Sequence, residues 1–305
     1  MRSLFITGGT GFMGRRVLRQ LVPADFRGVV CLRRRGDSDP PAAGPIVSGV
    51  SYVQGDLRNP ETYRRHLAGC DTVLHLAAAT GPAPREESMA VNADGTRALV
   101  RESEKAGVRD FLLVSTIAVK YPNPDRYPYA GSKRLAEAAV RESGLRYAIV
   151  RPTIVIGDDA PIWRTLAGLA RRRVILMPGT GRVRVQPIHV DDVAAQVLTL
   201  VKQDLFGNQI FELGGHESVT FEEFLRRVHW LGSGREPTVI HLPLGPILAT
   251  LTLLEPVLDA VLPVKAGQFY AFRYDSTVDP GARLPTGSAS SLGLDDMIRR
   301  CLANG

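Results

Sequence analysis

A tyrosine and a lysine four residues apart are the side chains best suited to chemistry in this sequence. Tyr129 and Lys133 share one face at the start of a predicted helix, and Pro128 is well placed to begin that helix. With 8 Tyr in 305 residues, only about 0.13 such pairs are expected by chance. A phenol has a pKa of about 10, and a neighbouring ammonium favours its ionised form. The pair indicates acid–base catalysis, and the alternative is a surface pair on an amphipathic helix.

A hydroxyl precedes this helix at the end of an expected strand. Residues 111–114 are apolar and predict a buried strand, which runs directly into Ser115 and Thr116. Either hydroxyl could bind the oxygen of a substrate and orient it for proton transfer from Tyr129. The residues themselves do not decide between the two.

Glycines dominate a stretch close to the N-terminus. Residues 4–6 predict a buried strand, four glycines follow within residues 8–14, and apolar residues at helical spacing come next. A strand, a glycine turn and a helix bind dinucleotides because pyrophosphate reaches the helix N-terminus only where Cβ atoms are absent. The alternative is a flexible turn. The predicted cofactor contacts of this stretch are Gly8, Thr10, Gly11, Phe12, Met13 and Gly14.

The next expected strand ends on arginines. Residues 28–32 predict a buried strand, after which an acidic residue would grip a ribose 2′-hydroxyl in an NAD(H) site. Arg33 and Arg34 occupy that place instead. A guanidinium binds a 2′-phosphate with paired hydrogen bonds, whereas a carboxylate repels it. The sequence therefore predicts NADP(H) in preference to NAD(H).

Strands alternate with helices over the first half of the chain, which predicts parallel βαβ units and an α/β fold. His75 lies inside an apolar run and is interpreted as a core histidine. The remaining expected strands are 50–54, 71–78 and 147–150, the helices are 60–68, 88–106 and 129–142, and the loops are 36–49 and 121–128.

Composition excludes several classes of protein. The net charge is +7, but the clusters Arg33–Arg35 and Arg171–Arg173 are not interleaved with aromatics, so a nucleic-acid surface fits poorly. Arg171–Arg173 is interpreted as a solvated loop or helix end. Cys31, Cys70 and Cys301 match no metal or disulfide spacing and suggest a reducing, cytoplasmic environment. No signal peptide is expected before the first strand, which starts almost at Met1.

Together these motifs resemble the extended and atypical short-chain dehydrogenases/reductases, the NAD-dependent epimerase/dehydratase group. The match spans roughly residues 3–215, with the motifs in the family's order. It rests on Thr7-Gly8-Gly9-Thr10-Gly11-Phe12-Met13-Gly14, Asp56-Leu57, Leu76-Ala77-Ala78, Ser115-Thr116-Ile117-Ala118-Val119, Tyr129-Ala130-Gly131-Ser132-Lys133, Arg151-Pro152 and Ile188-His189-Val190-Asp191-Asp192-Val193.

By this resemblance, Tyr129 is the general acid/base, Lys133 lowers its pKa and binds ribose, and Thr116 hydrogen-bonds the reacting oxygen. The implied activity is reversible carbonyl/alcohol hydride transfer on a small-molecule substrate. A homodimer is the assembly that the resemblance implies. It also implies that Asp56, Leu57, Leu76, Ala77, Ala78 and Pro152 contact the cofactor, together with Tyr129 and Lys133.

Two alternatives remain open. A nucleotide-sugar epimerase or dehydratase would usually carry an arginine three residues before the Ile188-His189 stretch, to clamp a diphosphate. Val185 stands in that register, with Arg184 one place earlier. A non-catalytic cofactor-binding or assembly subunit is the second alternative, because the C-terminal layout is similar to the branch of the respiratory complex I 39-kDa-type subunit. Retention of both Tyr129 and Lys133 favours catalysis.

The domain organisation follows from these motifs. Residues 1–155 are expected to form a Rossmann domain, completed by about 183–214, while 156–182 and 215–305 form a smaller substrate-binding region. A helix is expected from Val219 to Trp230, with Thr220 as N-cap and Glu223 closing a capping box. Residues 236–264 are unusually apolar but interrupted by prolines, which excludes a clean membrane span. They are interpreted as a cover for the substrate cleft, or as an apolar lid or membrane-surface contact.

Overall fold

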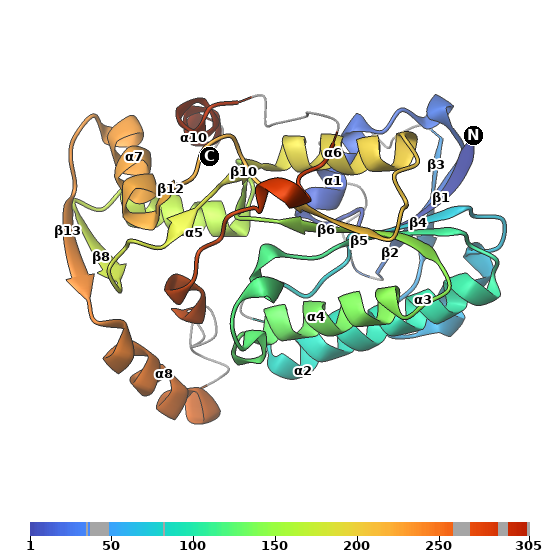
Figure 1. Cartoon of the computed structure of the whole chain (residues 1–305), viewed down its shortest axis with the longest axis horizontal. Coiled ribbons are helices and arrows are strands. Elements are labelled where there is room, and N and C mark those ends of the chain that lie inside the picture. Colours follow the sequence, from blue (N-terminus) through green and yellow to red (C-terminus); the bar gives the residue numbers. More distant parts are fainter. Residues whose placement is uncertain (35, 37–48, 82, 259–268, 286–291, 304–305) are drawn as a thin grey trace.

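A seven-stranded parallel sheet forms the centre of the molecule (Figure 1). This computed structural model describes residues 1–34, 36, 49–81, 83–258, 269–285 and 292–303. The strand order is β3-β2-β1-β4-β5-β6-β11, so the chain reverses its direction of winding between β1 and β4. Open sheets of this kind bind ligands at that reversal. The strands are β1 Arg2–Thr7, β2 Phe26–Arg33, β3 Val50–Gln54, β4 Thr72–His75, β5 Asp110–Val114, β6 Arg146–Pro152 and β11 Gln209–Leu213.

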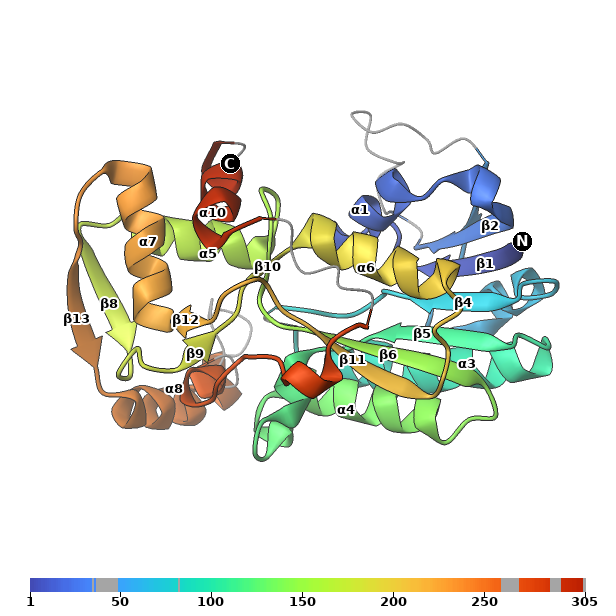
Figure 2. The same ribbon diagram turned by 45° about the horizontal axis from the view of Figure 1, so that its top comes forward.

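Helices cover both faces of the sheet, as predicted for a Rossmann fold (Figure 2). On one face lie α1 (Phe12–Gln20) and α6 (Val190–Lys202). On the other lie α3 (Gly95–Lys105), which follows α2 (Arg85–Ser88), and α4 (Pro128–Arg141). Apolar residues recur along these helices at the spacing that keeps one face against the sheet.

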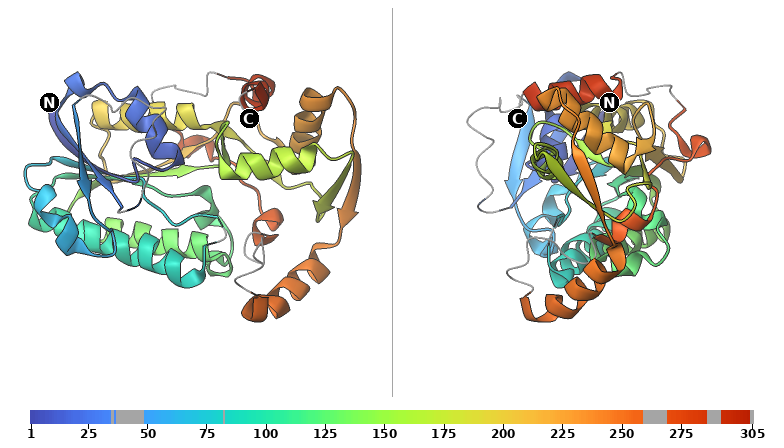
Figure 3. Two further views of the ribbon diagram at one scale, coloured as in Figure 1. Left: turned by 180° about the vertical axis from the view of Figure 1, so that it is seen from behind. Right: turned by 90° about the vertical axis from the view of Figure 1, so that its left-hand side faces the viewer.

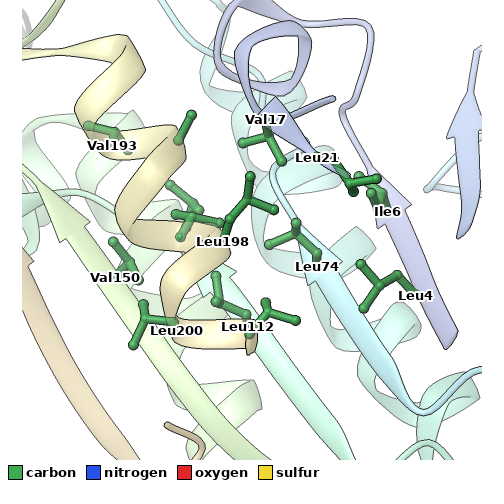
Figure 4. Packing of buried hydrophobic residues seen from close by; sticks show 14 of the residues in the cluster. Leu4, Ile6, Val17, Leu21, Leu74, Leu112, Val150, Val193, Leu198 and Leu200 are labelled. Atoms are coloured by element: carbon green, nitrogen blue, oxygen red, sulfur yellow. The ribbon is translucent and has the colours of Figure 1, made fainter. Parts of the chain in front are cut away.

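The alternation of side chains along each strand divides the core between the two faces. Leu4 and Ile6 of β1 pack with Leu74 and Leu112 beneath α1 and α6, as Figure 4 shows. Phe5, between them in sequence, points to the opposite face and packs with residues of α3 and α4. Because both faces are covered, the central strands β1, β4 and β5 are buried along almost their whole length rather than alternating between buried and exposed residues.

A second core lies beyond the sheet and draws on three separate parts of the chain. It gathers residues from 156–177, 219–228 and 294–301 together with Val185, and all of these except Val185 fall in the predicted substrate-binding region. Figure 3 shows its helices packed together at the end of the molecule opposite the N-terminus. Its elements, with the short strands that join it to the sheet, are β7 Val155–Ile156, α5 Pro161–Ala170, β8 Val174–Pro178, β9 Arg184–Val185, β10 Ile188–His189, β12 Val219–Thr220, α7 Phe221–Ser233, β13 Thr238–Leu242, α8 Leu244–Leu258 and α10 Leu294–Ala303.

Two helical predictions were wrong in detail. Residues 60–68 form two short 3-10 turns, Pro60–Thr62 and Arg64–His66, rather than an α-helix. The predicted helix 88–106 begins earlier, at Arg85, and its turns over Met89–Asp94 are π-helical. A π turn places one extra residue in the helix and is common at functional sites.

The other local predictions had mixed outcomes. Thr220 caps α7 by accepting a hydrogen bond from the Glu223 amide, as expected, but the Glu223 carboxylate pairs with Arg227. The apolar stretch from 236 contains β13 and α8, and its residues 259–264 lie outside the described part. The expected loop 36–49 lies outside it too, except for Gly36 and Gly49.

Candidate active site

The predicted site residues converge because parallel strands end at the same edge of the sheet. Thr7 ends β1 and Gly8 follows it, Arg33 ends β2, and Asp56 follows β3. On the other side of the reversal, Leu76, Ala77 and Ala78 follow β4, Ser115 and Thr116 follow β5, and Pro152 ends β6. The structure therefore brings the candidate cofactor residues of the strand ends and Thr116 to the carboxyl end of the sheet.

Two glycines are required by close approach of the main chain. Gly8 has a φ of 74°, and a Cβ atom there would overlap the backbone of Leu76 and Ala77. A Cβ on Gly14 would overlap the carbonyl of Gly8. At Gly11 a Cβ would meet only the Gly8 oxygen, at 3.3 Å. The protein therefore leaves more space around Gly11 than around Gly8 and Gly14. That cradle at the start of α1 fits the pyrophosphate of a dinucleotide.

Phe12 and Met13 connect the glycine loop to the rest of the fold. The Phe12 ring packs against Gly157, where a Cβ would lie 3.1 Å from a ring carbon, and against the second core. Met13 packs on the core between the sheet and the helices α1 and α6. One turn later, Arg15 donates to the Thr10 carbonyl at 3.0 Å and pairs with Asp159 at 2.6 Å. The loop is thus fixed between the sheet and the segment after β7.

Charged side chains gather at the ends of β2 and β3, where the adenosine part of the cofactor is predicted to bind. Arg33 is half-buried at the end of β2, and Arg34 next to it is exposed. The Asp56 carboxylate accepts bonds from the Arg58 guanidinium at 2.6 and 3.0 Å, which lowers its pKa, with a smaller contribution from Arg34. Leu57 is buried against Gly95. The Asp56–Arg58 pair and the buried Leu57 side chain therefore fix the segment after β3, which lies beside Arg33 and Arg34.

Tyr129 and Lys133 lie on the first two turns of α4, as predicted. Tyr129 remains partly accessible, yet desolvation raises the pKa of its phenol to about 12. Lys133 is only 1% exposed, and desolvation lowers the pKa of its amine to about 8, opposed by the Glu137 carboxylate one turn on. Without a cofactor, the Tyr129 pKa thus moves in the opposite direction from the one expected for an activated phenol.

The Lys133 amine is the clearest sign of a ligand site. Among the described residues, its Nζ has no hydrogen-bond partner, although it is buried. A buried ammonium without partners is costly, so such groups are usually paired. Glu137 does not supply the bond, because its two carboxylate oxygens accept from Nε and Nη2 of Arg151, at 2.9 and 2.6 Å. Ribose hydroxyls of a nicotinamide cofactor are acceptors that fit this amine.

The two candidate hydroxyls have different environments. Thr116 is half-buried, and its Oγ1 accepts a bond from the Ala118 amide at 3.3 Å, which caps the short 3-10 turn Ile117–Lys120. The Ser115 hydroxyl is buried and has no partner among the described residues. The bond to Ala118 uses Thr116 Oγ1 only as an acceptor, and the Thr116 hydroxyl proton has no acceptor in the described part of the chain. The role of Thr116 toward a substrate stays a prediction.

A buried chain of polar side chains runs between the glycine loop and the helix α3. Thr96 Oγ1 donates to the Asn92 carbonyl at 2.5 Å, so it must accept from His75 Nε2, 2.8 Å away. His75 Nδ1 then accepts from Thr7 Oγ1, at 2.6 Å, and this oxygen in turn accepts from the Ala77 amide at 3.4 Å. Burial and the nearby Lys133 lower the pKa of His75 to about 3. His75 is therefore a neutral core histidine, as interpreted from the sequence.

Asn92 continues this chain to the catalytic helix and was absent from the sequence-based site. Its amide exchanges two hydrogen bonds with the backbone of Ala79, at 2.8 and 3.0 Å. Its second N–H donates to Ser132 Oγ at 3.0 Å, and that hydroxyl donates to the Tyr129 carbonyl. Asn92 thus fixes the strand end 76–79 against α4. An asparagine near the start of the predicted helix 88–106 but inside it, where it is a poor helix former, is the signal that could have revealed it.

The contribution of the hydrogen bonds through His75 to stability can be tested by removing one hydroxyl. Thr96→Val keeps the side-chain shape but leaves the His75 Nε2 proton without an acceptor, so we expect it to lower the free energy of unfolding by about 1–3 kcal/mol. Chemical denaturation measures the effect. Thr199→Val is the matched control, because Thr199 makes the same bond to the carbonyl four residues earlier on the exposed side of α6. Equal effects of the two substitutions would show that the hydrogen bond to His75 adds nothing to the free energy of unfolding.

Comparison with known proteins places this site in a family. The family model described as NAD dependent epimerase/dehydratase family matches residues 4–214. The chain belongs to this family. A ceramide reductase of Caulobacter vibrioides is 33% identical to this family member over 253 residues, covering 82% of this chain and 76% of the relative. A 4-hydroxy-2-methyl-3-oxo-4-farnesyl-3,4-dihydroquinoline-1-oxide ketoreductase of Stigmatella aurantiaca is 29% identical over 241 residues, covering 72% and 70%.

Solved structures confirm the fold of this family member. MoeE5, in complex with UDP-glucuronic acid and NAD, has a TM-score of 0.75 at 20% identity and covers 99% of this chain and 98% of its own. DesIV, a dTDP-glucose 4,6-dehydratase from Streptomyces venezuelae with NAD and TYD bound, has a TM-score of 0.74 at 22% identity, with coverage of 99% and 96%. The family and the reductase relatives identify the chain as an NAD(P)-dependent oxidoreductase of the epimerase/dehydratase family.

Proposed function

We propose that this enzyme is an NADP(H)-preferring reductase that converts the carbonyl group of an apolar small molecule to an alcohol, reversibly. The names of the two relatives support the substrate class, because ceramide and a farnesyl-bearing quinoline both carry long hydrocarbon chains. The observation that carries the proposal is the environment of Val185.

Val185 stands where nucleotide-sugar members of the family carry their diphosphate-clamping arginine. The Val185 side chain is 3% exposed and packs in the second core. Arg184, its neighbour on β9, is exposed, and its guanidinium bonds to the hydroxyl and carbonyl of Ser218 at 3.1 and 2.5 Å. Neighbouring side chains on a strand point to opposite faces, so Arg184 does not replace the missing clamp. This favours a substrate without a nucleotide diphosphate.

Tyrosines around the start of α4 also favour an apolar substrate. The Tyr127 ring lies 5.8 Å from that of Tyr129, between centroids. Tyr274 stacks on Tyr121 at 5.5 Å, and its hydroxyl lies 2.9 Å from that of Tyr270. These contacts bring the C-terminal segment 270–274 against the loop that leads into the catalytic helix. Aromatic rings beside the reacting group suit hydrocarbon better than phosphate.

The chain's own residues would perform the proton chemistry. When bound, NADP(H) supplies or accepts the hydride at nicotinamide C4. With a pKa of about 12, the Tyr129 phenol is protonated at neutral pH and can give its proton to a carbonyl oxygen that is being reduced. Thr116 donates a hydrogen bond to the same oxygen. Lys133 holds the ribose hydroxyls, and its ammonium favours the phenolate that remains after proton transfer.

Arg33 supports the preference for NADP(H), and its removal is a direct test. Arg33→Gln should weaken NADPH binding about 10- to 100-fold, because charge-assisted bonds to a phosphate are lost, while NADH binding changes little. Fluorescence titration with each cofactor measures this. Arg19→Gln, on the exposed side of α1, is the control and should change neither. Tighter binding of NADH than NADPH by the unaltered enzyme would overturn the preference.

The substrate class needs its own assay. NADPH oxidation should be followed with a long-chain ketone dispersed in detergent and, separately, with UDP- and dTDP-sugars. We expect turnover with the ketone and no thermal stabilisation by the sugars. Stabilisation by a nucleotide sugar without NADPH oxidation would favour the epimerase or dehydratase alternative instead. Bound NADPH with no turnover of any carbonyl would favour a non-catalytic cofactor-binding subunit.

A further inference from the structure

One face of the small sheet formed by β8 and β13 carries large apolar side chains in solvent. Along β8, Ile175 and Met177 are fully buried, whereas Val174 and Leu176 point outward and are 40% and 45% exposed. On β13, Ile240 lies directly beside Leu176 in the parallel register and is 46% exposed. Aliphatic side chains exposed side by side in this way mark an interaction surface more often than isolated ones do.

Helix α8 extends this apolar region. It follows β13 after one residue, and Figures 1 and 3 show it at the end of the molecule farthest from the N-terminus, standing away from the central sheet. Residues 244–254 include no charged side chain. Leu244, Ile247, Leu248 and Leu251 recur at helical spacing and are all partly exposed. Helix α8 and the small sheet therefore bring partly or fully exposed aliphatic side chains to the same end of the molecule.

Most charged residues around this end are basic, although α8 carries Glu255 beyond its uncharged first turns. Residues 160–181 contain no acidic side chain, and Arg171, Arg172 and Arg173, which lead directly into β8, are all exposed. On the β13 side, the charged residues between 233 and 251 are Arg235 and Glu236, with His241 as the titratable group. The Glu236 carboxylate lies 3.5 Å from the Arg226 guanidinium, and Glu222 accepts from His241 at 2.9 Å. The acidic groups here are therefore paired with basic ones.

We propose that this end of the molecule, defined as Arg171–Arg173, Val174, Leu176, Ile240 and 244–251, binds the surface of an anionic lipid bilayer. Such a surface offers phosphate for the arginines and hydrocarbon for the aliphatic side chains, which is the combination present here. Within the part of the chain that the structure describes, no helix has the length and apolarity needed to cross a membrane. The proposal goes beyond the proposed function and does not depend on it.

Vesicle binding by the full chain tests this proposal. We expect co-sedimentation with phosphatidylcholine vesicles that contain phosphatidylglycerol, weak binding to phosphatidylcholine alone, and release by salt. Replacing Arg171, Arg172 and Arg173 together by Gln should weaken binding to anionic vesicles roughly 100-fold, since each arginine near such a surface contributes about fivefold. Arg64, Arg65 and Arg141, all exposed, form the matched triple that removes the same charge elsewhere.

A second pair of variants tests the apolar component. Leu176→Ser should also weaken vesicle binding, whereas Ile162→Ser, at an equally exposed position on α5, should not. Thermal unfolding checks that each variant is folded. No binding to anionic vesicles, or equal losses in the two arginine triples, would overturn the proposal. Light scattering could also overturn it. If the protein were a dimer and Leu176→Ser dissociated that dimer, the apolar face would be an interface between two copies of this chain.

Discussion

Tyr129→Phe is expected to reduce kcat for carbonyl reduction by about two to four orders of magnitude, with NADPH affinity nearly unchanged. The substitution removes only the phenolic proton donor and retains the ring that packs beside Tyr127 at the start of α4. Steady-state kinetics combined with a cofactor titration separates the two effects. Equal losses of turnover and cofactor binding would mean that the residue has a structural role.

Tyr127→Phe is the matched control for this experiment. Its phenol is close to that of Tyr129, and desolvation raises the pKa of both groups. Tyr127 does not have Lys at the fourth following position, and we expect its variant to retain most of the activity. If Tyr127→Phe abolished turnover and Tyr129→Phe did not, the assignment of the general acid would be wrong.

The elements that hold the cofactor could be predicted because their determinants are local. Gly14 is required by contacts with Gly8 and Gly9 within a short strand–turn–helix unit, and Gly8 adopts a positive φ in the same turn, although the backbone that a Gly8 Cβ would overlap is that of Leu76 and Ala77. Likewise, Tyr129 and Lys133 share a helix face through spacing alone. The strand order could not be obtained in this way, because pairing of β1 with β4 joins residues almost seventy positions apart.

The wrong helix at 60–68 has a physical explanation. Tyr63 and Leu67 are both fully buried and four residues apart, so the apolar spacing is helical. The main chain nevertheless forms bonds over three residues, from the Tyr63 amide to the Pro60 carbonyl and from the Leu67 amide to the Arg64 carbonyl. Two 3-10 turns place the same two side chains in the core. Periodicity therefore predicted which residues are buried and not which hydrogen bonds form.

The polar chain through His75 and Asn92 was inaccessible to local reasoning for a different reason. Each residue could be recognised alone, His75 as a core histidine and Asn92 as an unfavourable helix residue. What they do depends on partners from four separate segments: Thr7, Ala79, Thr96 and Ser132. Such a network is specified only by the tertiary structure. It nevertheless connects the two motifs that the sequence does reveal, the glycine loop and the catalytic helix.

Lys133→Met is expected to stabilise the cofactor-free protein while it impairs the enzyme. The Lys133 amine is buried without a hydrogen-bond partner in the described part of the chain, and its pKa falls from 10.5 to about 8. That difference corresponds to about 3 kcal/mol of unfavourable free energy for the charged form at neutral pH, as an upper bound. Methionine has a similar length and no charge, and the Arg151–Glu137 pair remains intact.

The stability difference between the unaltered protein and Lys133→Met should depend on pH. Because the folded-state pKa of Lys133 lies below the unfolded-state value, the unfolded chain binds the extra proton between about pH 8 and 10.5. The stability contributed by this position therefore rises with pH across that window. The advantage of Lys133→Met should be full below about pH 8 and disappear as the pH approaches 10.5. Denaturation at several pH values measures it, and Lys105→Met, at an exposed lysine on α3, should show no such trend.

Saturating NADPH should reverse the order of stability. The unaltered enzyme supplies the amine that ribose hydroxyls require, so the cofactor should stabilise it by RT ln(1 + [L]/Kd), a quantity that rises with affinity. The methionine side chain of the variant cannot donate a hydrogen bond, so the variant's affinity, its stabilisation by NADPH and its turnover should all fall. If the cofactor-free variant were less stable than the unaltered protein, burial of the Lys133 amine would not be destabilising. Unchanged NADPH affinity would show that the amine does not face the cofactor. Both measurements together therefore decide whether Lys133 is kept for binding at the expense of stability.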